Sequence, residues 1–213
     1  MLTNPYKRPV TLLLLAAFFI PTALANNYVS IIIDDFANSL EYGNMAIEVP
    51  GPITLAFLPH TGFASVLAER AHDSGKEIML HLPLQSIQHY VQTPGILKLH
   101  MTHREFITQL QSNISSIPHA KGINNHMGSL LTQHPGHMDW LMAALAAQGS
   151  FYFIDSRTTT KSVASLYARK HNVPNLQRDI FLDPDFRPDT IRREFSRTIL
   201  DSAVDRCYRY STL

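Results

Sequence analysis

Two acids follow an apolar run near the start of the chain. Asp34 and Asp35 come directly after Ile31-Ile32-Ile33. A short apolar run without alternation is typical of a strand buried on both faces of a parallel sheet, so we expect the two carboxylates at the mouth of that strand. Adjacent acids repel each other unless a cation or hydrogen-bond donors compensate. Taken alone, the pair fits equally well an acidic loop that caps the next helix.

The same pattern recurs along the chain, where a histidine or an aspartate follows each further apolar run. These residues are His60, His81, His126, Asp155 and Asp183. The carboxyl ends of parallel strands lie at one rim of a sheet, and ligands bind there. The other ends of the same runs carry few such residues. The recurrence therefore predicts one polar site at one rim.

Asp35, His81 and His126 would bring one carboxylate and two imidazoles from three strands. Zinc takes such ligands, and a catalytic zinc site has three protein ligands and one open position. A metal of this kind lowers the pKa of water and generates a nucleophile. Asp34 would then be the general base. Each histidine has an alternative as an ordinary rim or core residue, which we favour for His60 but not for His81 or His126.

Further polar residues could contact the substrate. Asn125 and the amides near Gly128 are candidates for orienting substrate oxygens. Arg157 could hold a carboxylate bidentately behind the metal ligands, with Asp155 nearby. Asp155 could equally cap a helix, with Arg157 on the surface, and the sequence leaves both interpretations open.

The elements that must position these residues alternate between strand and helix. We expect strands over 28–33, 53–58, 77–80, 121–123, 151–154 and 179–182, and helices over 39–48, 64–72, 102–115, 138–148, 162–171 and 190–204. Such alternation predicts an α/β fold with parallel strands and outer helices. No Gly-x-Gly-x-x-Gly follows the first strand, which excludes a dinucleotide site there. A full barrel needs about 250 residues, so we expect a distorted or incomplete β/α barrel.

The N-terminus has the order of a signal peptide over 1–25: Lys7-Arg8, an apolar run over 10–20, and Ala23-Leu24-Ala25. We therefore expect export to the periplasm or beyond, with the domain over 26–200. The apolar run is short for a membrane span, so none is expected after cleavage; an uncleaved anchor is the alternative.

The composition fits one globular domain, with 213 residues of which 45% are hydrophobic. The formal net charge of +1 gives no indication of nucleic acid or an anionic membrane as a partner. The single cysteine, Cys207, cannot form an internal disulfide. The oligomeric state stays open.

Together these segments resemble the divergent polysaccharide deacetylase family over about 28–200. The matching segments are Asp34-Asp35-Phe36, Leu55-Ala56-Phe57-Leu58-Pro59-His60, Leu80-His81-Leu82-Pro83, Asn124-Asn125-His126-Met127-Gly128-Ser129 and Asp155-Ser156-Arg157-Thr158. The resemblance implies a distorted β/α barrel, a divalent metal, and hydrolysis of an acetamide on an exported glycan such as peptidoglycan. It also implies that Asp34 is the base and that Asp35 binds the metal, with His81 and His126 as further ligands.

The chain departs from this family pattern in three places. Ala37 stands where the family usually has glycine, and its methyl group is expected to crowd the turn. Gln85 stands where glutamate is usual. Family members continue into a strand that carries a Gly-His-Pro segment. Residues 201–213 of this chain have neither, and this atypical tail resembles a truncation. Without a closing strand, two exposed strand edges should make the protein less stable and prone to aggregate.

Three functions follow from these observations. The first is a metal-dependent hydrolase of the cell envelope that deacetylates an N-acetylated polysaccharide, which the acids and histidines favour. The second is a catalytically weak or inactive envelope protein that keeps the fold and binds glycan or a protein partner, which Ala37, Gln85 and the tail favour. The third, a metal phosphoesterase, ranks last because no cluster of Arg or Lys is expected near the rim.

Overall fold

The computed structural model describes residues 28–213 except 89–92, 186, 203–207 and 210–213. The expected signal peptide lies outside the described residues. Within the described ranges, none of the helices has the length and the apolar character that a membrane crossing requires.

The strands are β1 (Val29–Phe36), β2 (Ile53–Phe57), β3 (Glu77–Leu84), β4 (Gly122–Met127), β5 (Tyr152–Asp155), β6 (Asn175–Gln177) and β7 (Tyr208–Arg209). The helices are α1 (Leu40–Glu48), α2 (Ala64–Asp73), α3 (His103–Ser115), α4 (Pro135–Gln148), α5 (Ala164–Lys170) and α6 (Pro188–Ser202), with a 3-10 turn, η1, at Leu131–Gln133. All paired strands are parallel, in the order β6-β5-β4-β3-β2-β1-β7.

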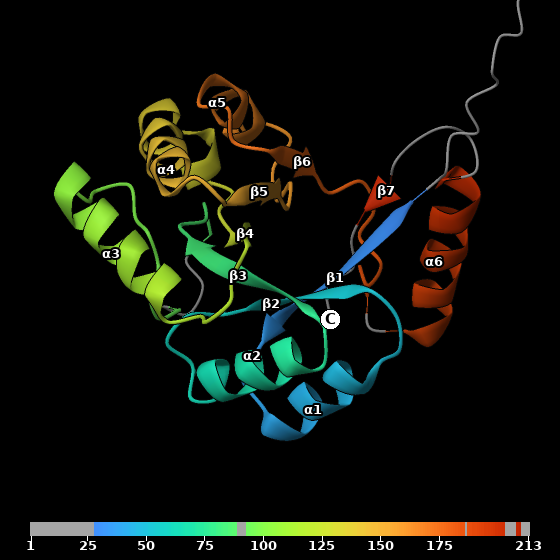
Figure 1. The fold of residues 1–213 in the computed structure, drawn as a ribbon. Coiled ribbons are helices and arrows are strands. Elements are labelled where there is room, and N and C mark those ends of the chain that lie inside the picture. Colours follow the sequence, from blue (N-terminus) through green and yellow to red (C-terminus); the bar gives the residue numbers. More distant parts are fainter. Residues whose placement is uncertain (1–27, 89–92, 186, 203–207, 210–213) are drawn as a thin grey trace, which may run out of the picture.

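The sheet curls into a half-barrel with α1 to α5 along its outer side (Figure 1). Within the described residues β6 and β7 are its two edges, and they do not pair with each other. The expectation of an incomplete β/α barrel with outer helices is confirmed. Because every strand runs in the same direction, all their carboxyl ends lie at one rim.

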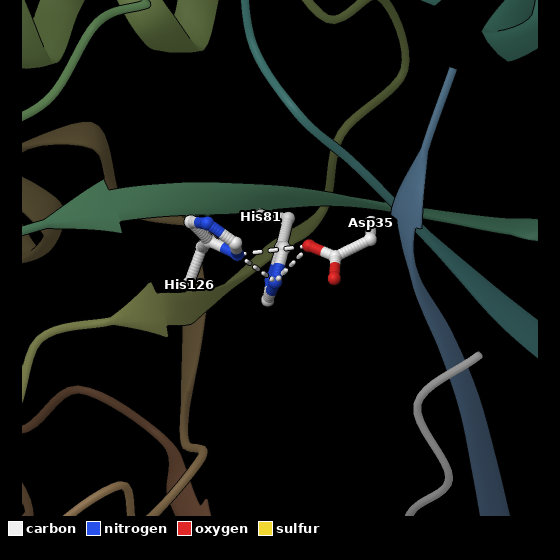
Figure 2. Close-up of side chains that lie close together, drawn as sticks. All are labelled: Asp35, His81 and His126. Atoms are coloured by element: carbon white, nitrogen blue, oxygen red, sulfur yellow. Dashed lines mark hydrogen bonds and ion pairs between the residues drawn. The ribbon is translucent and has the colours of Figure 1, made fainter. Parts of the chain in front are cut away.

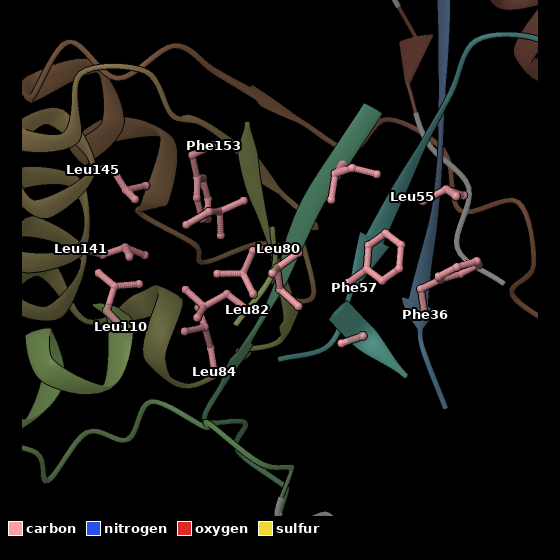
Figure 3. Close-up of a cluster of buried hydrophobic side chains, with 14 of the residues drawn as sticks. Phe36, Leu55, Phe57, Leu80, Leu82, Leu84, Leu110, Leu141, Leu145 and Phe153 are labelled. Carbon is pink, nitrogen blue, oxygen red and sulfur yellow. The ribbon is translucent and has the colours of Figure 1, made fainter. Parts of the chain in front are cut away.

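The main core lies between the outer face of the sheet and the helices. Leu55, Phe57, Leu80 and Phe153 are fully buried there, among the leucines of the helices (Figure 3). Burying one such side chain contributes about 1.5–3 kcal/mol, so this layer supplies much of the stability. Alternate residues of the strands form a second, smaller cluster on the inner face: Ile32, Ala56, Met79 and Ile154.

A glycine in β4 lets an aromatic ring cross the inner face. Gly122 pairs with Met79 of β3 on one side and with Tyr152 of β5 on the other. The Tyr152 ring lies over Gly122, and its hydroxyl donates a hydrogen bond to the Glu77 carboxylate on β3. A Cβ atom at position 122 would overlap the ring. The three strands are therefore joined by a side-chain bridge that requires glycine in the middle.

Two expectations about the last third of the chain were wrong. The sixth strand is Asn175–Gln177, which pairs with β5, and not 179–182. In the latter segment Ile180 and Leu182 are buried although the backbone has left the sheet, which explains its strand-like pattern. The tail, which was expected to add no strand, contributes the short β7, which pairs in parallel with Val29 and Ser30, although the barrel stays open as expected.

Candidate metal centre

Asp34 and Asp35 lie at the end of β1, where the pairing between β1 and β2 becomes irregular. Neighbouring residues of a regular strand point to opposite faces, so two consecutive acids could not both face the rim. Here Ile33 pairs with Leu55 and Phe36 pairs with Phe57, so β1 uses two residues where β2 uses one. This is the geometry of a β-bulge, which re-aims side chains beside active sites. Asp35 itself has a φ of 55°, in the left-handed region.

Asp35, His81 and His126 point toward one another at the rim (Figure 2). Oδ1 of Asp35 lies 2.8 Å from Nδ1 of His126 and 3.3 Å from Nε2 of His81. The two ring nitrogens are 3.2 Å apart. The three strands β1, β3 and β4 therefore deliver three ligand atoms to one point.

This donor set fits a divalent metal such as zinc. Zinc bonds to nitrogen and oxygen are about 2.0–2.2 Å long, so tetrahedral ligand atoms stand about 3.3 Å apart. Two of the three separations match this value, and the third, 2.8 Å from Asp35 to His126, needs a small outward movement. Asp35 can make that movement because its side chain is 48% exposed.

The second nitrogen of His81 is fixed by Asn124. Nδ1 of His81 lies 2.8 Å from Oδ1 of Asn124, and both side chains are buried. An amide oxygen only accepts, so Nδ1 donates its proton to Asn124, and Nε2 is the nitrogen that faces the site and could bind a metal. Such outer hydrogen bonds orient metal-binding histidines in proteins.

Asp34 lies behind this cluster and is 4% exposed. Its Oδ2 is 3.7 Å from Nε2 of His81. Burial raises the pKa of Asp34 to about 7, against the lowering effect of His81. A carboxylate with this pKa can both take up and release a proton near neutral pH.

The pKa values of Asp35 and His81 are both shifted toward the charged forms of these groups. Burial opposes ionisation of Asp35, but hydrogen bonds from His126 and His81 hold its pKa well below the usual range. Burial likewise disfavours the charged form of His81, but Asp34 and Asp35 together raise its pKa. A bound cation would replace the proton on His81, because a ligating imidazole is neutral.

The residues expected to contact substrate make internal contacts. Asn125 is 1% exposed; its Nδ2 donates to the Met127 carbonyl and its Oδ1 accepts from the Ser156 amide. The Arg157 guanidinium donates to Gln177 at 2.7 Å, and not to a carboxylate. Asp155 is fully buried and accepts from the Arg157 amide at 2.8 Å. These three residues hold the ends of β4, β5 and β6 together.

His60 is an ordinary rim residue outside the cluster, as we favoured from the sequence. Its Nε2 lies 2.9 Å from Oδ1 of Asn113, in α3.

Positive φ values recur at the ends of the strands. His60 has a φ of 58°, and Ala37, Met127 and Arg157 also have positive φ values. Such backbone conformations cluster at functional sites.

The main residue that the sequence reasoning missed is Arg178, just after β6. Its Nε donates to the Ser156 carbonyl at 2.7 Å. Burial lowers the pKa of Arg178, while Asp34, Asp155 and Asp183 oppose this. Arg178 therefore lies near three carboxylates, and a single arginine in this setting is not the basic cluster that phosphate binding would need. A lone arginine after an unrecognised strand gives no sequence signal.

The chain matches the family model of the divergent polysaccharide deacetylase over residues 31–201. It is 32% identical over 195 residues to the uncharacterized protein YibQ of Escherichia coli K12, which covers 92% of this chain and 60% of that protein. An uncharacterized protein of Haemophilus influenzae is 32% identical over 183 residues, which is 86% of this chain and 65% of that protein. The chain thus spans less than two thirds of these relatives.

Two crystal structures share the fold. The uncharacterized protein ATU2773 from Agrobacterium tumefaciens C58 superimposes with a TM-score of 0.81 at 19% identity, over 86% of this chain and 76% of that one. The lactam utilization protein from Thermus thermophilus gives a TM-score of 0.55 at 12% identity, over 86% and 89%. These likenesses concern the fold, while the family match concerns most of the sequence. The chain belongs to the divergent polysaccharide deacetylase family.

Proposed function

We propose that this protein is a metal-dependent hydrolase that removes acetyl groups from an N-acetylated polysaccharide of the cell envelope. The observation that carries the proposal is the convergence of Asp35, His81 and His126 beside Asp34. Zinc is the metal that we expect from one carboxylate and two imidazoles. The order of residues 1–25 supports export to the periplasm.

The chain's own groups have distinct tasks in this reaction. When bound, a divalent ion polarises the amide carbonyl and activates water. Asp34 accepts a proton from the attacking water and returns it to the departing nitrogen. The carbon–nitrogen bond breaks, and acetate and a free amine leave. Asp34 is placed for both proton transfers, because its Oδ2 lies 3.7 Å from Nε2 of His81, beside the position that the metal would take.

Acetate release from N-acetylated chitin oligosaccharides and peptidoglycan, with and without added zinc, tests the proposal. Asp35→Asn and His126→Ala should lose both the metal and the activity. Asp34→Asn should keep the metal and lose activity about 10²–10⁴-fold, the usual contribution of a general base. His60→Ala is the matched control, because this strand-end histidine bonds to Asn113 and lies outside the cluster.

The outcome also decides between the two envelope functions. If the purified chain binds zinc and glycan but releases no acetate with any divalent metal, the protein binds glycan and is not a deacetylase. If His60→Ala loses the metal as completely as His126→Ala, the assignment of ligands is wrong.

A further inference from the structure

A cavity of about 450 Å³ opens beside Asp35, between the end of β1 and α1. Asp34 and Asp35 form part of its wall, so it adjoins the metal centre. The rest of the wall is mainly apolar and includes Ile33, Phe36, Ala37, Met45, Ala46 and Val49. An apolar cavity of this size with a few polar groups at one end is typical of a small-molecule site.

The cavity is open because nothing described covers this side of α1. Elsewhere α1 packs on α2, where Gly43, which also borders the cavity, lies against Leu67. On the open side, Tyr42, Met45 and Val49 are 71%, 58% and 41% exposed. Their spacing of three and four residues places them in one stripe along the helix.

The edge of β1 is open in the same region. On the side of β1 away from β2, β7 pairs only at Val29 and Ser30, and no described strand lies on that side beside the half of β1 that carries the acids. A ligand can therefore reach from Asp35 over the end of β1 and onto α1.

We propose that this cavity takes the acyl chain of the substrate, and that the substrate is an amino sugar with an N-acyl group longer than acetyl. The inference rests on the proposed amide hydrolysis. A ligand with its amide at Asp35 and an alkyl chain against Phe36, Met45 and Val49 matches the polar and apolar parts of the site. The wall also carries Asn38, Ser39 and Tyr42, but most of its side chains are apolar and would leave hydroxyl groups of a buried sugar ring without hydrogen bonds.

Linear carboxylates from acetate to decanoate resemble the acid product and probe the cavity directly. Their binding to the full chain is measured by calorimetry, with and without zinc. Each buried methylene group should tighten binding about fourfold, until the chain fills the cavity. The same probes are compared on Ala46→Phe, which fills the cavity, and on Glu48→Phe, which adds the same ring to α1 outside it. Met45→Gln makes the exposed wall polar at little packing cost.

The dependence on chain length should be lost in Ala46→Phe, weakened in Met45→Gln and kept in Glu48→Phe. That result supports the acyl site even if no acetylated polymer is hydrolysed. Equal affinities for acetate and decanoate overturn it, even if acetate release is observed. Equal effects of Ala46→Phe and Glu48→Phe also overturn it, because binding would then lie elsewhere.

Discussion

Nδ1 of His81 donates a hydrogen bond to Oδ1 of Asn124 at 2.8 Å, and this bond directs the other ring nitrogen toward Asp35. The geometry of the candidate metal centre therefore depends on Asn124, which is not itself one of the three candidate ligands. Asn124 is 3% exposed, so no water replaces its amide without rearrangement.

Asn124→Ala should weaken zinc binding about 10- to 100-fold, the usual effect of losing an outer partner of a ligating histidine. Competition with a chromophoric chelator measures this, and circular dichroism checks the fold. Asn124→Asp keeps an acceptor and should bind zinc far better than Asn124→Ala. Identical affinities in wild type and Asn124→Ala would show that His81 is oriented by packing alone.

Asp34→Asn should stabilise the metal-free protein at pH 8, although it lowers the activity. The pKa of Asp34 rises from 3.8 to about 7 on folding, so the folded state binds the extra proton between these values. The free energy of unfolding therefore falls as pH rises through this window, by about 4 kcal/mol at most. Asparagine cannot ionise, so the free energy of unfolding of the variant should not fall in this way as pH rises.

Urea unfolding at pH 4 and pH 8, in the presence of a chelator, tests the sign. The variant should be close to wild type at pH 4 and more stable at pH 8. Asp189→Asn is the control, because that side chain is 97% exposed and its replacement should show no comparable pH dependence. A gain that is equal at both pH values would rule out ionisation as the cause.

Ala37→Gly should stabilise the protein by about 1 kcal/mol. Ala37 is buried with a φ of 91°, a conformation that costs a side chain about 1–2 kcal/mol and glycine almost nothing. Part of the gain is offset by the greater freedom of glycine in the unfolded chain. Thermal melting measures it. Ala147→Gly, at an exposed position of α4, should instead destabilise by about 0.5–1 kcal/mol.

Gly122→Ala should destabilise the protein by about 1–3 kcal/mol, because the new methyl group must displace the Tyr152 ring and its hydrogen bond to Glu77. Gly62→Ala is the matched control, since a Cβ there has no atom within 4 Å. Chemical unfolding of both variants measures the difference. Similar stabilities would mean that the Tyr152 bridge adjusts without cost.

The sequence predicts most of the scaffold because its signals are local. The apolar runs that end in Asp or His mark β1 to β5, and Thr102 and Glu105 have the spacing of a capping box, which they form at the start of α3. Because the strands are parallel, their carboxyl ends must lie at one rim of the sheet. The three metal-binding candidates were found in this way, and the structure brings them together.

The parts that escaped prediction depend on pairing between distant segments. β6 lies at Asn175–Gln177 because that segment pairs with β5, although the more apolar residues around Ile180 come later. Arg178 comes near Asp34 only because it directly follows β6 at this position. Asn125 was a candidate for orienting substrate oxygens, but its burial and its bond to the Ser156 amide appear only once β4 and β5 lie side by side.

Both acids can face the candidate centre only because of the bulge at the end of β1. Removing one residue between Ile33 and Phe36 would restore regular pairing with β2, and the remaining aspartate would be left as a single inward side chain. No point substitution has this effect. A one-residue deletion would therefore remove one acid of the candidate centre and make the pairing of β1 with β2 regular. The number of residues at this position thus matters as much as their chemical type.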